Sequence, residues 1–398
     1  MNVLRQLRNF WIPLVTMIVL ACFSNAVAQT RYEVKDLGAE NGDNLGMTMG
    51  LNNHGASLIM DQVVVPSVIS QNSTTPAGTV RIAIDGRNID LQTLGGKNSS
   101  INWGGINDNG EAVGLSETSG FDPNGEDVCG FGTGATCLPF LWRNGQMSAL
   151  PTLGGNNGQA SAINNRGQVT GYSETAVADS GCPFTPVGPT AVPVLWDKGQ
   201  AQALPTVSGD PDGVAFGIND LGQAVGYSGN CAAAVHAVIW ADGTVIQLPD
   251  NGPERSNVAY AINNQGQIVG KVRAADNSTY HVALWQCQPP SGLPPVCTLK
   301  DLGTLGQHSG FATSINSKGQ VVGSFVDSLR NWSGGFIYQD GVMTDLNTLF
   351  PTSNLSVISA SNINDRGQIS GMALVTSGPD QGNVHAFLAT PVDNGGGE

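Results

Sequence analysis

One short phrase recurs seven times along the chain and limits its possible folds more than any other feature. Each copy places Leu or Ile before Asn, with Gly three residues after that Asn. A period near 50 residues with strand-like content indicates a repeated β unit rather than stacked helix pairs. The Leu or Ile residues stand at positions 51, 106, 163, 218, 262, 315 and 363, so successive copies are 44 to 57 residues apart.

Each repeat contains four candidate strands, which we call a, b, c and d. Strand a ends in the Leu/Ile-Asn phrase, and the Asn-x-x-Gly segment predicts a hairpin turn to strand b, because Asn and Gly tolerate positive φ. Strand c ends in Trp in several copies, and a second x-Gly turn leads to a short strand d. Seven units of four antiparallel strands predict an all-β, seven-bladed β-propeller. We expect the recurring aromatics to pack between blades: Trp142, Trp196, Trp240 and Trp285.

The two ends of the repeat region complement each other. The last repeat has strands a, b and c, the third beginning at His385, but no strand d. Residues 32–38 have the pattern of a strand d without a, b and c before it. Pairing this N-terminal strand with the last blade would close the ring and remove an exposed sheet edge.

The first 28 residues have the features of a secretory signal peptide. Arg5 and Arg8 form a positive segment, an apolar run covers residues 10–23, and Ala26-Val27-Ala28 fits a cleavage site. A lipoprotein anchor at Cys22 is the alternative that fits its own pattern less well. We therefore expect a secreted protein, periplasmic or extracellular, with a propeller domain over residues 29–391 and a Gly-rich tail over 392–398.

The charge balance narrows the possible partners. The chain carries 31 acidic and 17 basic residues, a formal net charge of -14, and only 12% of its residues are charged. An acidic surface repels phosphate backbones, so we expect no nucleic acid as a partner. No second apolar segment of membrane length follows the leader, so we expect no membrane span. We expect a monomer.

The cysteines that follow the leader suggest disulfides, because their number is even and the chain has an export signal. Two fall in one b–c loop, two in b–c loops of neighbouring blades, and two flank a Pro-rich c–d insertion. No CxxC pair is present, so a thiolate metal site is poorly supported, and we expect no cofactor. The predicted pairs are Cys129–Cys137, Cys182–Cys231 and Cys287–Cys297.

The two faces of a propeller carry different loops. The a–b and c–d turns share one face, while the b–c loops and the d–a links share the other. Here the b–c loops vary strongly in length, and irregular loops on a rigid scaffold are where binding usually occurs. We therefore predict that the ligand face is formed by the b–c and d–a loops, at or near the central channel.

Five residues are candidates for this ligand face. Trp103 stands where most repeats have Ala, so its ring is predicted near the channel mouth, as a plug or a ligand platform. The acids lie in the predicted loops, where solvated surface charge is the simpler interpretation. His308 has no visible partner in the sequence. The set is Trp103, Asp122, Asp127, Asp212 and His308.

Signatures of known enzyme classes are missing from the sequence. It has no GxSxG elbow, HExxH motif or phosphate-binding loop, so we name no catalytic and no metal-binding residue. His236, His281 and His385 recur at the start of strand c in separate blades, which favours structural hydrogen bonds over a shared site. The first hypothesis is a non-enzymatic binding module for an extracellular glycan or protein. The alternative is a carbohydrate-active hydrolase or lyase with acids on the same loop face.

The repeat signature resembles one known family. The His385-Ala386-Phe387 strand, the Ile-Asn-x-x-Gly turns and the Asp-Leu-Gly links are similar to those of bacterial HAF-repeat extracellular proteins. The resemblance covers residues 32–391 and implies export and a repeat fold. It implies no activity and no catalytic residues. Ile84 and Ala389 depart from the pattern, because they stand where other copies of strand c carry Trp.

Overall fold

The structure is a computed structural model that describes residues 30–40, 44–62, 78–101, 105–178, 189–230, 233–252, 256–276, 278–288, 295–306, 309–327, 332–350 and 353–392. These residues form 28 β-strands and one short 3-10 helix, η1 (Leu346–Leu349). No helix in these ranges has the length and apolar character needed to cross a membrane.

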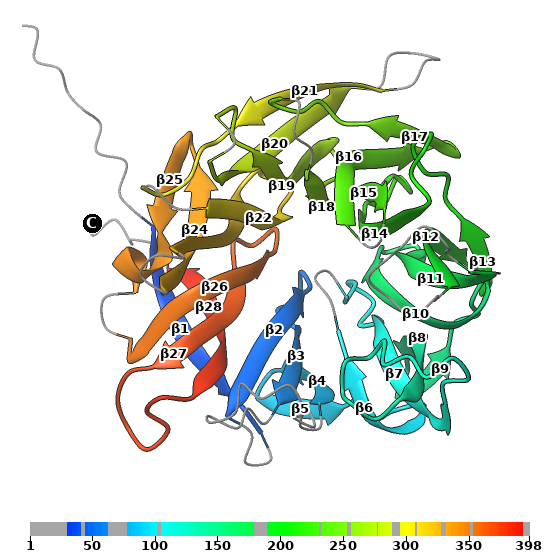
Figure 1. Ribbon diagram of the computed structural model, residues 1–398. Coiled ribbons are helices and arrows are strands. Elements are labelled where there is room, and N and C mark those ends of the chain that lie inside the picture. Colours follow the sequence, from blue (N-terminus) through cyan, green and yellow to red (C-terminus); the bar gives the residue numbers. More distant parts are fainter. Residues whose placement is uncertain are drawn as a thin grey trace, which may run out of the picture.

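The strands form four-stranded antiparallel blades arranged around an axis, as predicted (Figure 1). Blades 1 and 7 are joined into one eight-stranded sheet by a single parallel pairing of Leu45 with Val384. Blade 1 contains β2 (Leu45–Leu51), β3 (Ser57–Gln62), β4 (Gly78–Ile84) and β5 (Arg87–Asp90); blade 2 β6 (Gly95–Ser100), β7 (Ala112–Phe121), β8 (Ala135–Arg143) and β9 (Gln146–Ala149); blade 3 β10 (Gly154–Ile163), β11 (Val169–Ala178), β12 (Pro189–Asp197) and β13 (Gln200–Ala203); and blade 4 β14 (Asp212–Ile218), β15 (Ala224–Asn230), β16 (Ala233–Ala241) and β17 (Thr244–Gln247).

The remaining blades follow the same order. Blade 5 contains β18 (Val258–Ile262), β19 (Gln267–Arg273), β20 (Tyr280–Gln288) and β21 (Val296–Asp301); blade 6 β22 (Ser309–Ile315), β23 (Val321–Asp327), β24 (Trp332–Gln339) and β25 (Val342–Asp345); and blade 7 β26 (Leu355–Ile363), β27 (Ile369–Val375), β28 (Val384–Val392) and β1 (Arg31–Gly38). Strand d of the last blade is thus the first strand of the chain.

The pairing of β1 with β28 confirms the predicted closure of the ring. The two strands run antiparallel with Arg31 opposite Val392 and Asp36 opposite Phe387, and they lie side by side in Figure 1. Tyr32 is buried and packs edge-on against Phe350, with ring centroids 5.7 Å apart. The N-terminal strand therefore contributes core contacts as well as ladder hydrogen bonds.

A buried arginine ties the end of β1 to blade 1. Arg81 on β4 forms an ion pair with Asp61 on β3, and both side chains are buried. The same guanidinium donates a hydrogen bond to the Leu37 carbonyl oxygen at 3.1 Å. Because a buried charge needs both a counter-ion and hydrogen-bond partners, this arrangement links the first and last blades.

The hydrophobic core lies in layers between neighbouring blades. One layer joins Val113 of blade 2 with Ile163, Val194 and Trp196 of blade 3. The tryptophans lie in these layers as predicted, and three of them donate an indole hydrogen bond to the carbonyl oxygen of a Pro in the preceding d–a link. These pairs are Trp196–Pro151, Trp240–Pro205 and Trp285–Pro249, each at 2.7 Å.

The two kinds of turn use asparagine differently. In the c–d turn of blade 2, Asn144 and Gly145 both have positive φ, 52° and 82°, which is the type I′ pattern. In the a–b turns only the glycine is left-handed, as at Gly167 with φ of 77°. The proposed reason for asparagine in the a–b turns was therefore wrong. Its side chain, rather than its backbone freedom, is what those turns use.

A second glycine of the phrase permits a close approach of strands a and b. A Cβ on Gly226 would lie 1.9 Å from the carbonyl oxygen of Val214, and Gly171 and Gly270 face the same restriction. Opposite these glycines the register of strand a shifts, as between Ala215 and Gly217 of β14. Such a shift is a β-bulge, in which one extra residue has no partner on the neighbouring strand.

Two of the three predicted disulfides lie within the described residues, and both are confirmed. Cys129 bonds to Cys137 in the b–c loop of blade 2, and Cys287 bonds to Cys297 across β20 and β21. Cys182 and Cys231 lie outside the described residues. Both observed bridges are local, since their cysteines are 8 and 10 positions apart in the sequence.

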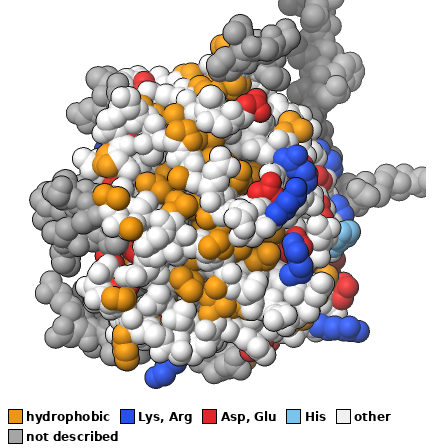
Figure 2. All heavy atoms as spheres, turned by 90° about the vertical axis from the view of Figure 1, so that its right-hand side faces the viewer, with side chains coloured by type: hydrophobic (Ala, Val, Ile, Leu, Met, Phe, Trp, Pro, Cys, Tyr) orange, Lys and Arg blue, Asp and Glu red, His pale blue; other side chains and the backbone are white. Residues whose placement is uncertain are grey.

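The outer side of the ring reflects the low charge content of the sequence. Figure 2 shows apolar side chains in small groups among uncharged polar ones, with most Lys and Arg side chains in this view lying toward one edge. Small exposed apolar groups of this kind are normal for soluble surfaces. This side of the ring therefore does not itself indicate a binding site.

Candidate binding site in the central channel

The a–b turns form a closed ring of asparagine side chains at one mouth of the channel. Each Nδ2 donates a hydrogen bond of 2.9–3.1 Å to the backbone carbonyl oxygen of the equivalent asparagine in the next blade. Each Oδ1 accepts backbone N–H groups of its own turn, as Asn219 Oδ1 does from Leu221 and Gln223. The ring consists of Asn52, Asn107, Asn164, Asn219, Asn263, Asn316 and Asn364.

A second ring of short polar side chains lies beside the first. At six of its seven positions the backbone N–H donates to a side-chain oxygen of the next blade at 2.8–2.9 Å. The carboxylates alternate with amides, so Asn165 Nδ2 donates to Asp108 Oδ2 on one side and Asp220 Oδ2 on the other. The members are Asn53, Asp108, Asn165, Asp220, Asn264, Ser317 and Asp365.

The side chains at this mouth hold neighbouring blades together and leave few groups free to react. Its cavity of about 210 Å³ is lined by the two polar rings and by the Leu and Ile residues beneath them. The three carboxylates already accept hydrogen bonds from neighbouring amides. In the described part of the chain no group of three or more His, Cys, Asp or Glu side chains could hold a metal ion.

A second cavity, of about 150 Å³, lies deeper in the channel and shares the collar of Ile163, Ile218, Ile262 and Ile315 with the mouth. Phe216 and Tyr260 line it on blades 4 and 5. Asn362 lines it from blade 7; the residue is 5% exposed, and its Oδ1 accepts no hydrogen bond from any described residue. The chamber thus combines aromatic rings with a buried amide that can bond to a ligand.

The aromatic rings of this chamber belong to a longer row. Phe216 lies 5.8 Å from Tyr227 and 5.3 Å from Tyr260, and Tyr260 lies 6.2 Å from Phe311, measured between ring centroids. The row crosses blades 4, 5 and 6. Burial raises the pKa of Tyr227 to about 12 and raises that of Tyr260 as well. Both phenols therefore hold their protons more tightly than an exposed tyrosine does.

The bulges of strand a explain why two members of this row, Phe216 and Tyr260, are difficult to predict. Phe216 falls at the register shift between Ala215 and Gly217, and Tyr260 at the shift between Ala259 and Ala261. A residue at a bulge is redirected out of the regular alternation of the strand. The recurring Ala before each bulge was the only local signal in the sequence.

Of the five predicted ligand-face residues, three lie in the described part of the chain: Asp122, Asp127 and Asp212. Trp103 and His308 lie outside the described residues. Asp122 is buried, 7% exposed, and its Oδ1 accepts the N–H groups of Asn124 and Glu126, whereas Asp127 is exposed and accepts from the Gly132 N–H. Asp212 is also buried, at the start of β14.

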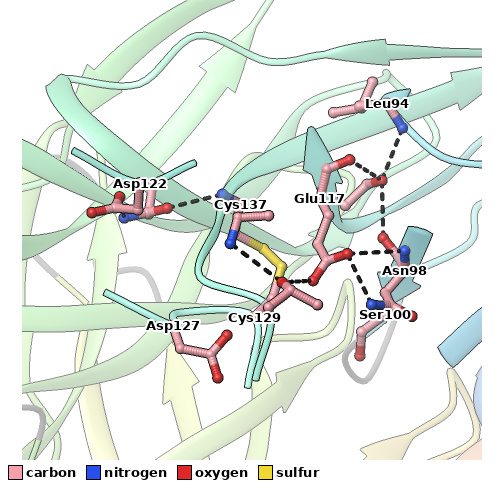
Figure 3. The surroundings of a disulfide bond; sticks show 12 residues. Leu94, Asn98, Ser100, Glu117, Asp122, Asp127, Cys129 and Cys137 are labelled. Carbon is pink, nitrogen blue, oxygen red and sulfur yellow. Dashed lines mark hydrogen bonds between the residues drawn. A yellow bond between two sulfur atoms is a disulfide. The ribbon is translucent and has the colours of Figure 1, made fainter. Parts of the chain in front are cut away.

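The acids near the b–c loops are held by buried asparagines. Asn157 Nδ2 donates to Asp122 Oδ2 at 2.8 Å and to Glu174 Oε2 at 3.0 Å. Figure 3 shows the related pair in blade 2, where Glu117 is directed toward Asn98 while Asp122 and Asp127 lie on the other side of the disulfide. Glu117 and Glu174 are 1% and 4% exposed. These carboxylates therefore hold strands together below the surface.

Glu174 should make the stability of the protein depend on pH. Burial is the largest cause that raises its pKa, and the carboxylates of Glu126 and Asp122 raise it further. Its contribution to stability is therefore complete below the pKa of the unfolded chain and is lost as the pH rises through the folded-state value. We expect Glu174→Gln to lose less thermal stability than the parent between about pH 4 and pH 7. The exposed residue Glu33 provides the control, and Glu33→Gln should lose as much thermal stability as the parent over this range. If Glu174→Gln also loses as much as the parent, the prediction is contradicted.

The recurring histidines form carboxylate pairs, in keeping with the structural role expected of them. His385 Nδ1 lies 2.9 Å from Asp36 of β1, and His281 Nδ1 lies 2.9 Å from Asp301 of β21, so each joins strand c to strand d. In blade 4 strand d carries Gln247 at this place, and Asp210 of the preceding link pairs with His236 at 2.8 Å instead. Each pair lies in its own blade.

A further cavity, of about 510 Å³, lies on the b–c face of blade 2. It is bordered by Lys97, Glu117 and Phe121, and Phe121 is 81% exposed. It is a larger space than the channel chamber, but the buried Oδ1 of Asn362, unpartnered among the described residues, belongs to a residue that lines the chamber. We therefore take the channel as the candidate site.

The strand pairings define the chain as a β-propeller. A profile of the family described as "Protein of unknown function (DUF3466)" matches residues 211–394. No curated protein matches the sequence.

Several solved structures resemble the chain at low sequence identity. The β-propeller domain of the Trilobed protease from Pyrococcus furiosus has 8% identity and a TM-score of 0.46, covering 89% of this chain and 100% of that one. A protein of unknown function from Dyadobacter fermentans has 8% identity and a TM-score of 0.41, covering 90% and 99%. Trypanosoma rangeli sialidase has 11% identity and a TM-score of 0.37, covering 86% and 54%.

Proposed function

We propose that this chain is an exported, non-enzymatic binding module of the HAF-repeat type. Its ligand enters the channel from the b–c and d–a loops and contacts the aromatic row of Tyr227, Phe216, Tyr260 and Phe311. The observation that carries this proposal is that row, which borders a chamber containing the buried amide of Asn362. Flat rings beside a few polar groups are typical of sites that bind without chemistry.

The two ends of the channel support this direction of entry. The a–b mouth is covered by two rings of hydrogen-bonded side chains, each of which ties one blade to the next. Opening that mouth would break contacts between blades. The b–c and d–a loops differ from blade to blade, so they can form a ligand surface without disturbing the rings.

A carbohydrate-active hydrolase or lyase is the second candidate. It needs two carboxylates near one another, and Asp122 and Glu174 do bind the same amide nitrogen. Both are buried, and Asp122 also caps its own turn. A catalytic acid must contact its substrate, so the structure favours the binding module.

Removing an aromatic ring from the row should weaken binding. The mature chain is screened on glycan and peptide arrays, with a hydrolysis assay on each hit. We expect Phe216→Ala and Tyr260→Ala to lower affinity about tenfold or more, as aromatic anchors do, while Tyr260→Phe keeps most of it. Leu221→Ala, an exposed apolar residue on the a–b turn of blade 4, is the matched control. Turnover of a hit, or equal affinity of all four variants, would contradict the proposal.

A further inference from the structure

Lysine replaces tyrosine at one of three equivalent positions of strand b. Strand b carries Tyr172, Tyr227 and Lys271 at equivalent places in blades 3, 4 and 5, each directly after the glycine that faces the bulge. Tyr227 lies opposite Val214 of strand a, and Lys271 lies opposite Val258. The ammonium group of Lys271 is therefore placed where the preceding blades present a phenol.

A second cation joins it on the same side of the blade. Lys271 Nζ lies 4.5 Å from the centroid of the Tyr280 ring, and the Arg273 guanidinium carbon lies 4.3 Å from the same centroid. The Tyr280 N–H donates to Ser309 Oγ at 3.3 Å, two residues before Phe311 on β22. The backbone of Tyr280, whose ring both cations contact, thus adjoins the strand that carries Phe311, the last member of the aromatic row.

Neither cation has an acidic partner among the described residues. By contrast, Arg81 forms an ion pair with Asp61, and Arg143 forms one with Glu111. Lys271 is half-buried, and burial is the largest cause that lowers its pKa. Two like charges held over one ring, in a protein with net charge -14, favour an anion at this place.

We propose that the ligand of this channel is an anionic saccharide, whose carboxylate or sulfate group binds Lys271 and Arg273 while its sugar ring lies against the aromatic row. This inference rests on the proposed binding function and adds the chemical class of the ligand. A guanidinium binds a carboxylate or sulfate through two parallel hydrogen bonds. The aromatic faces suit the C–H faces of a sugar ring, and Asn362 can bond to its hydroxyl groups.

The test compares polymers that differ in charge. Binding of the mature chain to polygalacturonate, dextran sulfate and neutral dextran is measured by titration calorimetry, with poly-glutamate as an acidic peptide. We expect at least one acidic polysaccharide to bind about tenfold or more tightly than dextran, with the preference falling as salt is raised. Polygalacturonate and dextran sulfate distinguish a carboxylate ligand from a sulfate ligand.

Matched variants locate the charge. Lys271→Met and Arg273→Gln should each lower affinity for the acidic polysaccharide about tenfold. Lys300→Met removes the same charge from strand d of blade 5, where Lys300 bonds to the Tyr338 hydroxyl, and should change affinity less than about twofold. Thermal melts verify that the variants are folded.

Three results would overturn the inference. The first is that dextran binds as tightly as the acidic polymers. The second is that Lys300→Met weakens binding as much as Lys271→Met does. The third is that poly-glutamate is the only probe that binds. The first and third would leave a binding module in place and reject only the ligand class. Failure of every array and polymer probe would reject the proposed function together with the inference.

Discussion

A chain that lacks residues 31–38 should fail to form a stable ring. The deletion removes β1 and with it the ladder to β28, the buried ring of Tyr32 and the carboxylate partner of His385. Loss of one large buried aromatic alone costs about 3 to 5 kcal/mol. The total stability of a domain is about 5 to 15 kcal/mol. We therefore expect the truncated protein to be unfolded or aggregated, because the edge of β28 is then exposed.

A circular permutant provides the control for this deletion. Arg31 lies opposite Val392, so residues 31–40 can be attached after Val392 through a two-residue Asn-Gly turn, like the c–d turn of blade 2. This protein begins at Asn44 and has a continuous blade 7. We expect its melting temperature to lie close to that of the parent. A truncated chain that melts like the parent would show that β1 does not close the ring.

Breaking one link of the asparagine ring should have the next largest effect. Asn219 is buried and makes four hydrogen bonds: from Leu221 N and Gln223 N to its Oδ1, and from its Nδ2 to the Asn263 carbonyl oxygen and to Gln223 Oε1. We expect Asn219→Ala to lower the free energy of unfolding by about 3 kcal/mol, since buried partners are left unsatisfied. Urea unfolding followed by tryptophan fluorescence measures it.

The second ring supplies a matched control for this substitution. Asn264 occupies the exposed ring, where the next blade has Ser317 at the equivalent place. Asn264→Ser should therefore change stability by less than about 1 kcal/mol. If Asn264→Ser and Asn219→Ala cost the same, the seven buried amides would not be the links between blades that the structure indicates.

Much of the fold could be predicted because its strongest signals are local and repeated. The Asn144-Gly145 turn and the glycine before each b strand mark hairpins within a single repeat. The orphan strand at residues 32–38 reveals closure, because one chain end has what the other lacks. Pairing Cys287 with Cys297 follows from the same map, since they flank one c–d insertion.

The channel could not be predicted in the same way, because it is formed between blades. Asn219 contacts the carbonyl oxygen of Asn263, 44 residues away, and a pattern within one repeat does not show that contact. The available signal was the asparagine present in all seven copies of the phrase, and we explained that asparagine by its tolerance of positive φ. Phe216 and Tyr260 face the channel through bulges, which the strict alternation of a strand does not predict.

An engineered disulfide between β1 and β28 tests the closed ring most directly. Glu33 lies opposite Thr390, and directly opposed residues on antiparallel strands have the Cα separation that a disulfide requires. We predict that Glu33→Cys with Thr390→Cys forms a bond spontaneously, seen by intact mass and by resistance to alkylation. The diagonal pair Glu33→Cys with Leu388→Cys should form it far less, because its Cα atoms are about 7–8 Å apart. Free thiols in the first variant, or equal bonding in both, would contradict a propeller closed by its own first strand.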